Sequence, residues 1–211
     1  MRAMVVQRYG PPDVLKWSEV PDPKLKSGQA VIRVKAVGIN FADLLARLGV
    51  YTNTPKPPFV PGLELSGVVE EVAPSGGGQS VAASLKPGDR VAALTMFRAY
   101  AERVAVNVEQ AFRIPDAMSF EDAAAIPVNY LTAYHSFFEM GNLRAGDRVL
   151  ITSAAGGVGC GSTQFLHMRR TRRCAHTRFS ELATRNGSMP MFIRRFTVLG
   201  ASLVCSVDST R

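Results

Sequence analysis

The first half of the chain alternates between short apolar runs and clusters of proline and glycine. Four segments before residue 107 are rich in β-branched residues or alternate between apolar and polar positions, as half-buried strands do. These segments are residues 3–7, 30–37, 65–72 and 89–93. Proline and glycine between such runs are typical of turns. The pattern predicts a small β-rich domain.

One stretch in this half has the spacing of a helix. Its apolar positions recur every three to four residues, at Phe41, Leu44, Leu45 and Leu48. Asn40 precedes the stretch as a cap, and Gly49 follows it as an end signal. We therefore predict a helix over residues 41–48.

From residue 119 the pattern becomes helical. Ser119 and Asp122 have the spacing of a capping box before an alanine-rich stretch, and Pro127 leads into a second helical run over residues 129–140. Residues 146–153 then give a turn and a continuous apolar strand, followed at once by the small residues 154–159. Strand, glycine turn and helix in this order predict the start of an α/β layer.

The glycine turn is a candidate dinucleotide site. A pyrophosphate is bound by backbone N–H groups at a helix N-terminus, and glycines let the chain approach it closely. Ala155, Gly156, Gly157 and Gly159 supply such a turn. Small residues also serve ordinary strand–helix packing, so the motif alone leaves both interpretations open. The full fingerprint needs a charged residue about 20 positions later to read the ribose, and none is evident.

The positive charge of the chain is concentrated at its end. The formal net charge is +8, but residues 160–211 hold nine arginines, no lysine and two acids. The first 159 residues are therefore nearly neutral. The arginine cluster at residues 169–173 can attract phosphates, but no recognised nucleic-acid-binding fold or aromatic platform accompanies it. We expect no nucleic-acid partner.

Composition excludes several other classes of protein. With 46% hydrophobic and 20% charged residues, the chain can bury at least one core. No apolar run of signal length or of about 18 residues occurs, so we expect no secretion and no transmembrane segment, with a cytoplasmic location as the default. The spacing of Cys160, Cys174 and Cys205 matches neither a metal site nor a redox pair.

Six stretches form a multi-part pattern over residues 1 to about 159. They are GINFAD at 38–43, LARLGVY at 45–51, PGLELSG at 61–67, GDRV at 88–91, VNYLTAY at 128–134 and SAAGGVG at 153–159. Their order and spacing resemble the zinc-independent quinone oxidoreductases of the medium-chain dehydrogenase/reductase superfamily, and within them the VAT-1 subgroup. The resemblance implies a chaperonin-10-like (GroES-like) β-barrel domain followed by the start of an α/β dinucleotide-binding (Rossmann) domain.

The resemblance also implies a domain organisation. We place the barrel at residues 1–118, the start of the nucleotide-binding domain at 119–159, and a divergent basic tail, incomplete or poorly ordered, at 160–211. Family dimers join through strands of the nucleotide-binding domain, so a homodimer is implied for the complete family form. Contact with a membrane surface stays open.

The implied chemistry is hydride delivery from NADPH, with NADH not excluded, to a quinone or enone substrate. Zinc-using relatives carry a cysteine where Asn40 stands and a histidine where Leu63 stands, so no zinc is expected. By the resemblance, Asn40 and Asp43 are the catalytic residues at the nicotinamide end. The cofactor-binding residues implied are Asn40, Thr132, Ala155, Gly156, Gly157, Val158 and Gly159.

Plainer roles exist for the same kinds of residue. Asn40 can simply cap the following helix, and Asp43 can sit in its first turn because the helix dipole favours an acid there. Tyr51, Tyr130 and Tyr134 can stack near a planar substrate, but packing at the interface between the barrel and the nucleotide-binding domain is the simpler interpretation. Glu64 matches a family position, and we expect a structural role for it.

The family pattern stops just after Gly159. Members continue with an alanine-rich helix and further strand–helix units, whereas residues 160–211 are rich in arginine, serine and threonine without clear periodicity. Translation in another frame or through an unspliced intron gives such sequence, so a truncated or misassembled gene product is the first hypothesis. The alternative is that residues 196–208 are the second strand of the nucleotide-binding domain after an insertion.

A nucleotide-binding domain with one or two strands cannot cover both faces of a parallel sheet. We therefore expect the apolar residues 149–151 to be exposed and the chain to be poorly soluble. The leading hypothesis for function is an NADPH-dependent oxidoreductase of quinones or activated carbonyls in the complete form. The alternative is a non-catalytic truncated barrel fragment or partner-binding protein.

Overall fold

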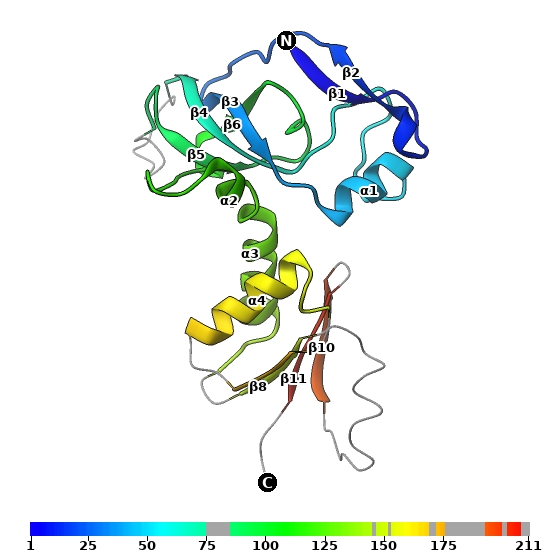
Figure 1. The fold of residues 1–211 in the computed structure, drawn as a ribbon, viewed down its shortest axis with the longest axis vertical. Coiled ribbons are helices and arrows are strands. Elements are labelled where there is room, and N and C mark those ends of the chain that lie inside the picture. The colour runs from blue at the N-terminus through cyan, green and yellow to red at the C-terminus, as the bar shows by residue number, and fades with distance from the viewer. Residues whose placement is uncertain are drawn as a thin grey trace. The chain divides into compact units, whose positions relative to one another are not determined.

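The computed structural model of the chain divides into two units, Met1–Val128 and Asn129–Arg211. Figure 1 colours the chain from its N-terminus in blue to its C-terminus in red. The residues that the structure describes are 1–74, 85–144, 147–151, 153–168, 172–175, 193–199 and 202–207.

The first unit is built from two antiparallel sheets (Figure 1). The larger sheet has five strands in the order β6-β3-β4-β5-β7, and the smaller pairs β1 with β2. The strands are β1 Arg2–Val6, β2 Leu15–Glu19, β3 Gln29–Val37, β4 Glu64–Val72, β5 Arg90–Leu94, β6 Arg103–Asn107 and β7 Ala111–Arg113. Four of them, β1, β3, β4 and β5, confirm the predicted strands to within one residue at each end.

Alternate positions of these strands fill the core of the first unit, because successive side chains of a strand point to opposite faces. Ile32, Leu65, Val69, Val91 and Val104 are each at most 2% exposed. Burying one such side chain contributes about 1.5–3 kcal/mol. The packed sheet therefore fixes the positions of the polar residues at its strand ends.

Helix α1, Phe41–Leu48, has the predicted bounds, and Gly49 ends it in the left-handed region with a φ of 78°. Its buried side does not follow the apolar spacing. Phe41, Leu44 and Leu48 are 57%, 42% and 47% exposed, whereas Asp43 and Ala46 are buried. The apolar spacing marks the helix correctly but not its buried face, because polar contacts of Asp43 occupy the barrel side.

Helix α2, Phe120–Ala124, follows the predicted cap. The hydroxyl of Ser119 accepts a hydrogen bond of 3.0 Å from the backbone N–H of Asp122. The helix packs on β3, β4 and β5, so it belongs to the first unit. Two short 3₁₀ helices complete this unit, at Pro12–Val14 and Val108–Gln110.

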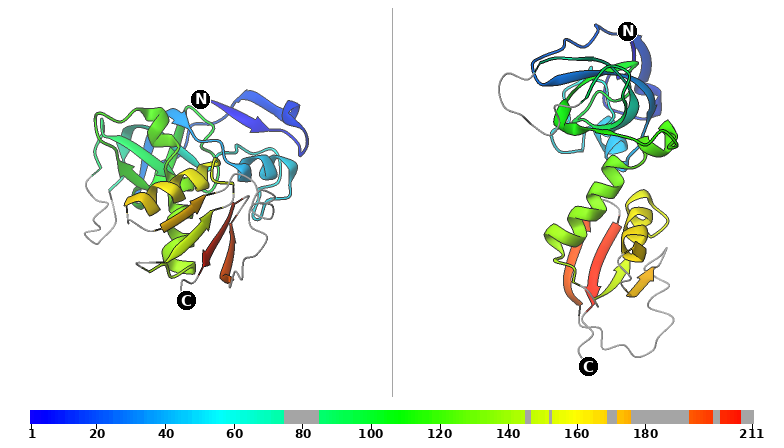
Figure 2. Two further views of the ribbon diagram at one scale, coloured as in Figure 1. Left: turned by 60° about the horizontal axis from the view of Figure 1, so that its bottom comes forward. Right: turned by 90° about the vertical axis from the view of Figure 1, so that its left-hand side faces the viewer.

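The second unit contains a strand–helix–strand motif (Figure 2). Helix α3, Pro127–Tyr134, leads into it and continues as a π-helical stretch over His135–Met140. Strand β8, Arg148–Ile151, is followed by helix α4, Gly157–Met168, and then by β9, Arg172–Ala175, which pairs with β8 in parallel. The sheet is completed by β10 Ile193–Leu199 and β11 Ser202–Val207, in the order β10-β11-β8-β9.

The predicted exposure of residues 149–151 is wrong for the two side chains that the structure describes. Val149 is 2% exposed and Ile151 is fully buried. They pack with Phe137 of the π-helical stretch and Leu166 of α4, because helices supply the cover that further strand–helix units provide in a larger domain. Val149 and Ile151 lie on one face of the strand, so the structure shows that this face is covered, and the expected poor solubility stays a prediction.

The structure also corrects the interpretation of the segment after Gly159. Helix α4 runs from Gly157 to Met168, so the divergent sequence begins within a helix. Strand β11 pairs with β8 antiparallel, so residues 196–208 are not the parallel second strand, and β9 holds that place. Residues 169–171 of the arginine cluster, Asp208 and the glycine-rich residues 75–84 lie outside the described residues.

Candidate functional site

The predicted pair Asn40 and Asp43 lies together at the N-terminus of α1. The backbone N–H of Asn40 donates to Oδ2 of Asp43 at 2.9 Å, and the backbone N–H of Asp43 donates to the carbonyl oxygen of Asn40 at 3.0 Å. Both residues are buried, with 8% and 5% exposure. Asn40 thus occupies the cap position of α1, and the side chain of Asp43 binds back to the backbone of Asn40.

Glu64 joins this pair from the first position of β4. Its Oε1 accepts a hydrogen bond of 2.7 Å from Nδ2 of Asn40, and its Oε2 accepts one of 2.7 Å from the backbone N–H of Val128. The residue is only 1% exposed. A single carboxylate thus connects the cap of α1 with the first turn of α3.

Tyr100 and Gly62 complete the surroundings of Asp43. The Tyr100 hydroxyl donates to Oδ2 of Asp43 at 3.0 Å, and the backbone N–H of Gly62 donates to Oδ1 at 3.2 Å. Gly62 has a φ of 101°, a backbone angle that residues other than glycine rarely adopt. We call Asn40, Asp43, Gly62, Glu64 and Tyr100 the buried polar network.

Two acids in this network, Asp43 and Glu64, have raised pKa values. Burial raises the pKa of Asp43 above its ordinary value of 3.8, and hydrogen bonds from Asn40, Tyr100 and Gly62 offset part of the rise. Burial also raises the pKa of Glu64 above 4.5, and the nearby charge of Asp43 adds to it. Burial and the charge of Asp43 raise the pKa of Tyr100 as well. Within the described ranges, no cationic side chain forms an ion pair with either acid.

These shifts predict a pH dependence of stability. A raised pKa in the folded chain means that it binds the proton more tightly than the unfolded chain does, so the stabilisation is full below the unfolded value and is lost as the pH rises through the folded value. Relative to the double variant Asp43→Asn, Glu64→Gln, the wild-type free energy of unfolding should therefore decrease from about pH 4 upward. Urea unfolding at a series of pH values measures both proteins, and parallel profiles would contradict the assignment.

The glycine turn lies between β8 and α4. Ser153 has a φ of 52°, and its carbonyl oxygen accepts a hydrogen bond of 2.9 Å from the backbone N–H of Gly156. Ala155, Gly156 and Gly157 are exposed, and α4 begins at Gly157. The first N–H groups of a helix have no partner within it, so this turn presents donors to solvent where an anion is favoured.

Two glycines of the turn are required by close contacts. A Cβ atom on the buried Gly159 would lie 2.5 Å from the carbonyl oxygen of Ser153 and 2.6 Å from the Cα atom of Ala154. A Cβ atom on Gly157 would overlap the side-chain amide of Asn129 on α3. The turn is therefore packed tightly from below, while its outer side stays open. This combination fits a pyrophosphate held by backbone groups.

The tyrosines of α3 contact other side chains of the second unit. The Tyr130 hydroxyl donates to Oε1 of Gln164 at 2.6 Å, and the Tyr130 and Phe165 rings meet edge to face with centroids 5.8 Å apart. Tyr134 contacts the rings of Phe138 and Phe165. Both tyrosines thus contact residues of the second unit, although Tyr134 remains 45% exposed, and a place between the two domains stays a prediction.

The sequence is similar to known proteins over about three quarters of its length. The family described as Alcohol dehydrogenase GroES-like domain matches residues 26–116. A synaptic vesicle membrane protein VAT-1 homolog of Danio rerio is 46% identical over 164 residues, which are 77% of this chain and 33% of that protein. A quinone oxidoreductase of Pongo abelii is 37% identical over 78% of this chain and 49% of that protein. The chain is thus similar to VAT-1 homologues and to quinone oxidoreductases over part of their length.

Solved structures of similar proteins superpose on the chain and confirm the predicted fold class. The human VAT-1 homolog-like protein has a TM-score of 0.77 and 41% identity, covering 86% of this chain and 57% of that protein. The quinone oxidoreductase of Thermus thermophilus, solved also in complex with NADPH, has a TM-score of 0.71 and 39% identity, covering 87% and 56%. The chain thus spans a third to somewhat over half of the length of these relatives. Among its described helices, none is long and apolar enough to cross a membrane.

The family site residues fall in both units. Asn40 and Asp43 meet in the first unit, whereas Val158, Gly159 and the exposed turn residues belong to the second. Thr132 is half-buried on α3, and its carbonyl oxygen accepts a hydrogen bond of 2.6 Å from the hydroxyl of Ser136. It stays a prediction that all of these residues contact one cofactor. No group of three or more metal-binding side chains occurs among the residues that the structure describes.

Three residues of the site were not assigned this role from the sequence. Tyr100 is 57 residues from its partner Asp43, so no local pattern connects the two. Asn129 lies inside a quoted family motif, but only the fold shows its side chain against Gly157. Glu64 carries a signal in the sequence, because it is an acid at the start of a strand whose first half is otherwise mostly apolar.

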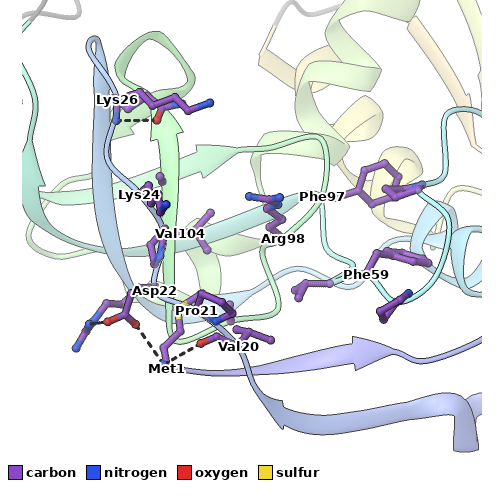
Figure 3. A pocket seen from close by; sticks show the side chains of 18 residues that line it. Met1, Val20, Pro21, Asp22, Lys24, Lys26, Phe59, Phe97, Arg98 and Val104 are labelled. Carbon is purple, nitrogen blue, oxygen red and sulfur yellow. Dashed lines mark hydrogen bonds and ion pairs between the residues drawn. The ribbon is translucent and has the colours of Figure 1, made fainter.

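A separate groove lies elsewhere on the barrel (Figure 3). Its volume is about 640 Å³, and no residue of the buried polar network lines it. Apolar side chains such as Phe59 and Phe97 form one end, and Lys24, Lys26 and Arg98 border it elsewhere. The groove is therefore distinct from the buried polar network.

Proposed function

We propose that this chain carries the barrel and the pyrophosphate turn of an NADPH-dependent, zinc-independent reductase of quinones or enones, active in the complete form of the protein. The observation that carries the proposal is the open glycine turn at the start of the twelve-residue helix α4, directly after a buried strand. The relative from Thermus thermophilus, solved with NADPH, supports the choice of cofactor.

Each site residue has a role in this proposal. The backbone N–H groups from Ala155 to Gly159 hold the pyrophosphate, and Thr132 on α3 contacts the cofactor. Asn40 binds at the nicotinamide end, while Asp43 keeps Asn40 in place through the cap of α1. The bound nicotinamide supplies the hydride, and the protein binds and orients the two reactants. Asn40 and Leu63 stand at positions where zinc-using relatives have ligands, which supports a reaction without zinc.

The direct test is the oxidation of NADPH with a quinone as acceptor. For an active form, Asn40→Ala is expected to lower kcat/KM by about 10- to 100-fold, because it removes a side chain that orients the reactants. Asn107→Ala is the matched control, since Asn107 is exposed on β6 and outside the network. The control should retain activity within about twofold. Lack of quinone-dependent oxidation of NADPH and NADH by this chain and its longer forms would rule out the proposal.

The second candidate is a non-catalytic barrel that binds a partner. It is favoured by exposed apolar side chains on and beside α1, namely Ile39, Phe41, Leu44, Leu48 and Val50. For the complete form we propose a homodimer in the cytoplasm, acting on a small molecule. Native mass spectrometry separates the two candidates, because a stable heteromer without NADPH binding would favour the partner-binding role.

A further inference from the structure

Glu64 is placed where an acid is costly. It is 1% exposed, and no cation pairs with it in the described part of the chain. An ionised carboxylate without a cation is tolerated in the interior only when hydrogen bonds replace its lost water. The position therefore calls for an explanation beyond packing.

Both oxygens of this carboxylate are used, and each on a different element. Oε1 accepts from Nδ2 of Asn40 and Oε2 from the backbone N–H of Val128, both at 2.7 Å. An ionised carboxylate only accepts hydrogen bonds. Asn40 must therefore turn the NH₂ end of its amide toward Glu64, which determines where its carbonyl oxygen points.

The surrounding backbone is fitted to this arrangement. A Cβ atom on Gly38 would overlap the Glu64 carboxylate, so the acid occupies space that only glycine leaves open. The backbone N–H of Gly38 also donates to the carbonyl oxygen of Glu64 at 3.3 Å. Glu64 is thus held on its backbone side as well as by its carboxylate.

The hydrogen bond between Val128 and Glu64 fixes the start of helix α3. Val128 follows Pro127 in the first turn of α3, where backbone N–H groups lack partners within the helix and favour a negative acceptor. The same helix carries Asn129, against the glycine turn at Gly157, and Thr132. One carboxylate therefore holds Asn40 and the start of the helix that bears these residues.

We infer that Glu64 is a positioning residue, which sets the orientation of the Asn40 amide and fixes the first turn of α3 through the same carboxylate. The inference rests on the proposed function, because that function assigns Asn40 and Thr132 to the cofactor. It goes beyond a structural role, since it makes the acceptor character of both Glu64 oxygens necessary for cofactor binding.

Glu64→Gln is the variant that separates shape from acceptor character. The glutamine has the same size but offers one acceptor and one donor. If its oxygen keeps the bond to Val128, its NH₂ group faces Asn40, and the Asn40 amide must turn over to offer its oxygen. The fold survives, while the amide of Asn40 points the other way.

Ser66→Ala is the matched control. Ser66 lies two residues further along β4, is fully buried, and donates its hydroxyl hydrogen to the carbonyl oxygen of Phe120 at 2.5 Å. The control removes another buried tether from β4 to a helix but leaves Asn40 untouched. Both variants are expected to melt within a few degrees of each other.

The experiment measures two quantities on the 211-residue chain and both variants. The first is the hydrogen-exchange protection of the Asn40 side-chain N–H by NMR, identified by its loss in Asn40→Ala. The second is the dissociation constant for NADPH. Glu64→Gln should lose the protection and bind NADPH about tenfold more weakly, and Ser66→Ala should keep both within about twofold.

Two results would overturn the inference. One is retained protection of the Asn40 amide in Glu64→Gln. The other is an equal loss of NADPH affinity in both variants, which would show a general structural effect. A wild-type chain that does not bind NADPH would contradict the proposed function instead, and the protection of the amide would then decide the role of Glu64 by itself.

Discussion

Gly62→Ala is expected to lower the free energy of unfolding of the first unit by about 3–5 kcal/mol. The variant forces a side chain onto a φ of 101°. Its Cβ atom would lie 2.7 Å from the Cβ atom of Ala99 and would overlap the ring of Tyr100. Tyr100 and the backbone N–H of Gly62 both bind Asp43, so the buried polar network loses two contacts together. Urea unfolding monitored by circular dichroism measures the change.

Gly88→Ala is the control for this prediction. Gly88 has a similar φ of 93°, but a Cβ atom there meets nothing within 4 Å. In this variant backbone strain alone lowers the free energy of unfolding, by about 1 kcal/mol. Equal destabilisation of the two variants would show that the contact with Tyr100 contributes nothing.

Gly159→Ala is expected to weaken NADPH binding at least about 100-fold, and to destabilise the second unit by about 3 kcal/mol. The added Cβ would meet backbone atoms of Ser153 and Ala154, which cannot turn away as a side chain can. The turn must therefore shift relative to α4, and its N–H groups lose their common direction. Fluorescence titration with NADPH and thermal melting measure the two effects.

Gly161→Ala separates this effect from helix propensity. It lies on the same helix, and its Cβ would come no closer than 3.4 Å to the Tyr130 ring. Alanine in place of glycine within a helix is favourable by about 1 kcal/mol, so this variant should melt higher and bind NADPH normally. If it lost NADPH binding to the same degree, the turn would not be the cause.

Helix α1 shows what local sequence can predict and what it cannot. Its bounds follow from the cap residue Asn40 and from Gly49, since both signals act within one turn of the helix. Its buried face does not follow from them. Asp43 faces the barrel because Gly62 and Tyr100, 19 and 57 residues away, supply donors there.

The glycine turn shows the same division. Its place between a strand and a helix is predictable, because three to four small residues after an apolar run have few other uses. The contact of Asn129 with Gly157 is not, because it depends on how α3 lies against α4. The site is thus predictable in its motifs and unpredictable in its polar partners.

The segment after Gly159 was the least predictable from sequence. The strand propensity of the end of the chain is visible, but whether a strand pairs in parallel or antiparallel depends on its neighbours in the sheet. Strand β9 is four residues long and rich in arginine, and it nevertheless takes the parallel place beside β8. Tertiary pairing there overrides a composition that indicates a polar tail.

The most direct test of the cofactor site is hydrogen-exchange mass spectrometry of the 211-residue chain with and without NADPH. The proposed site predicts added protection in peptides that cover residues 153–163, because the pyrophosphate would bind the N–H groups of the turn and order the start of α4. Peptides lining the groove beside Arg98 should not change. Protection in that groove, or none at the turn with saturating NADPH, would contradict a dinucleotide site at the glycine turn.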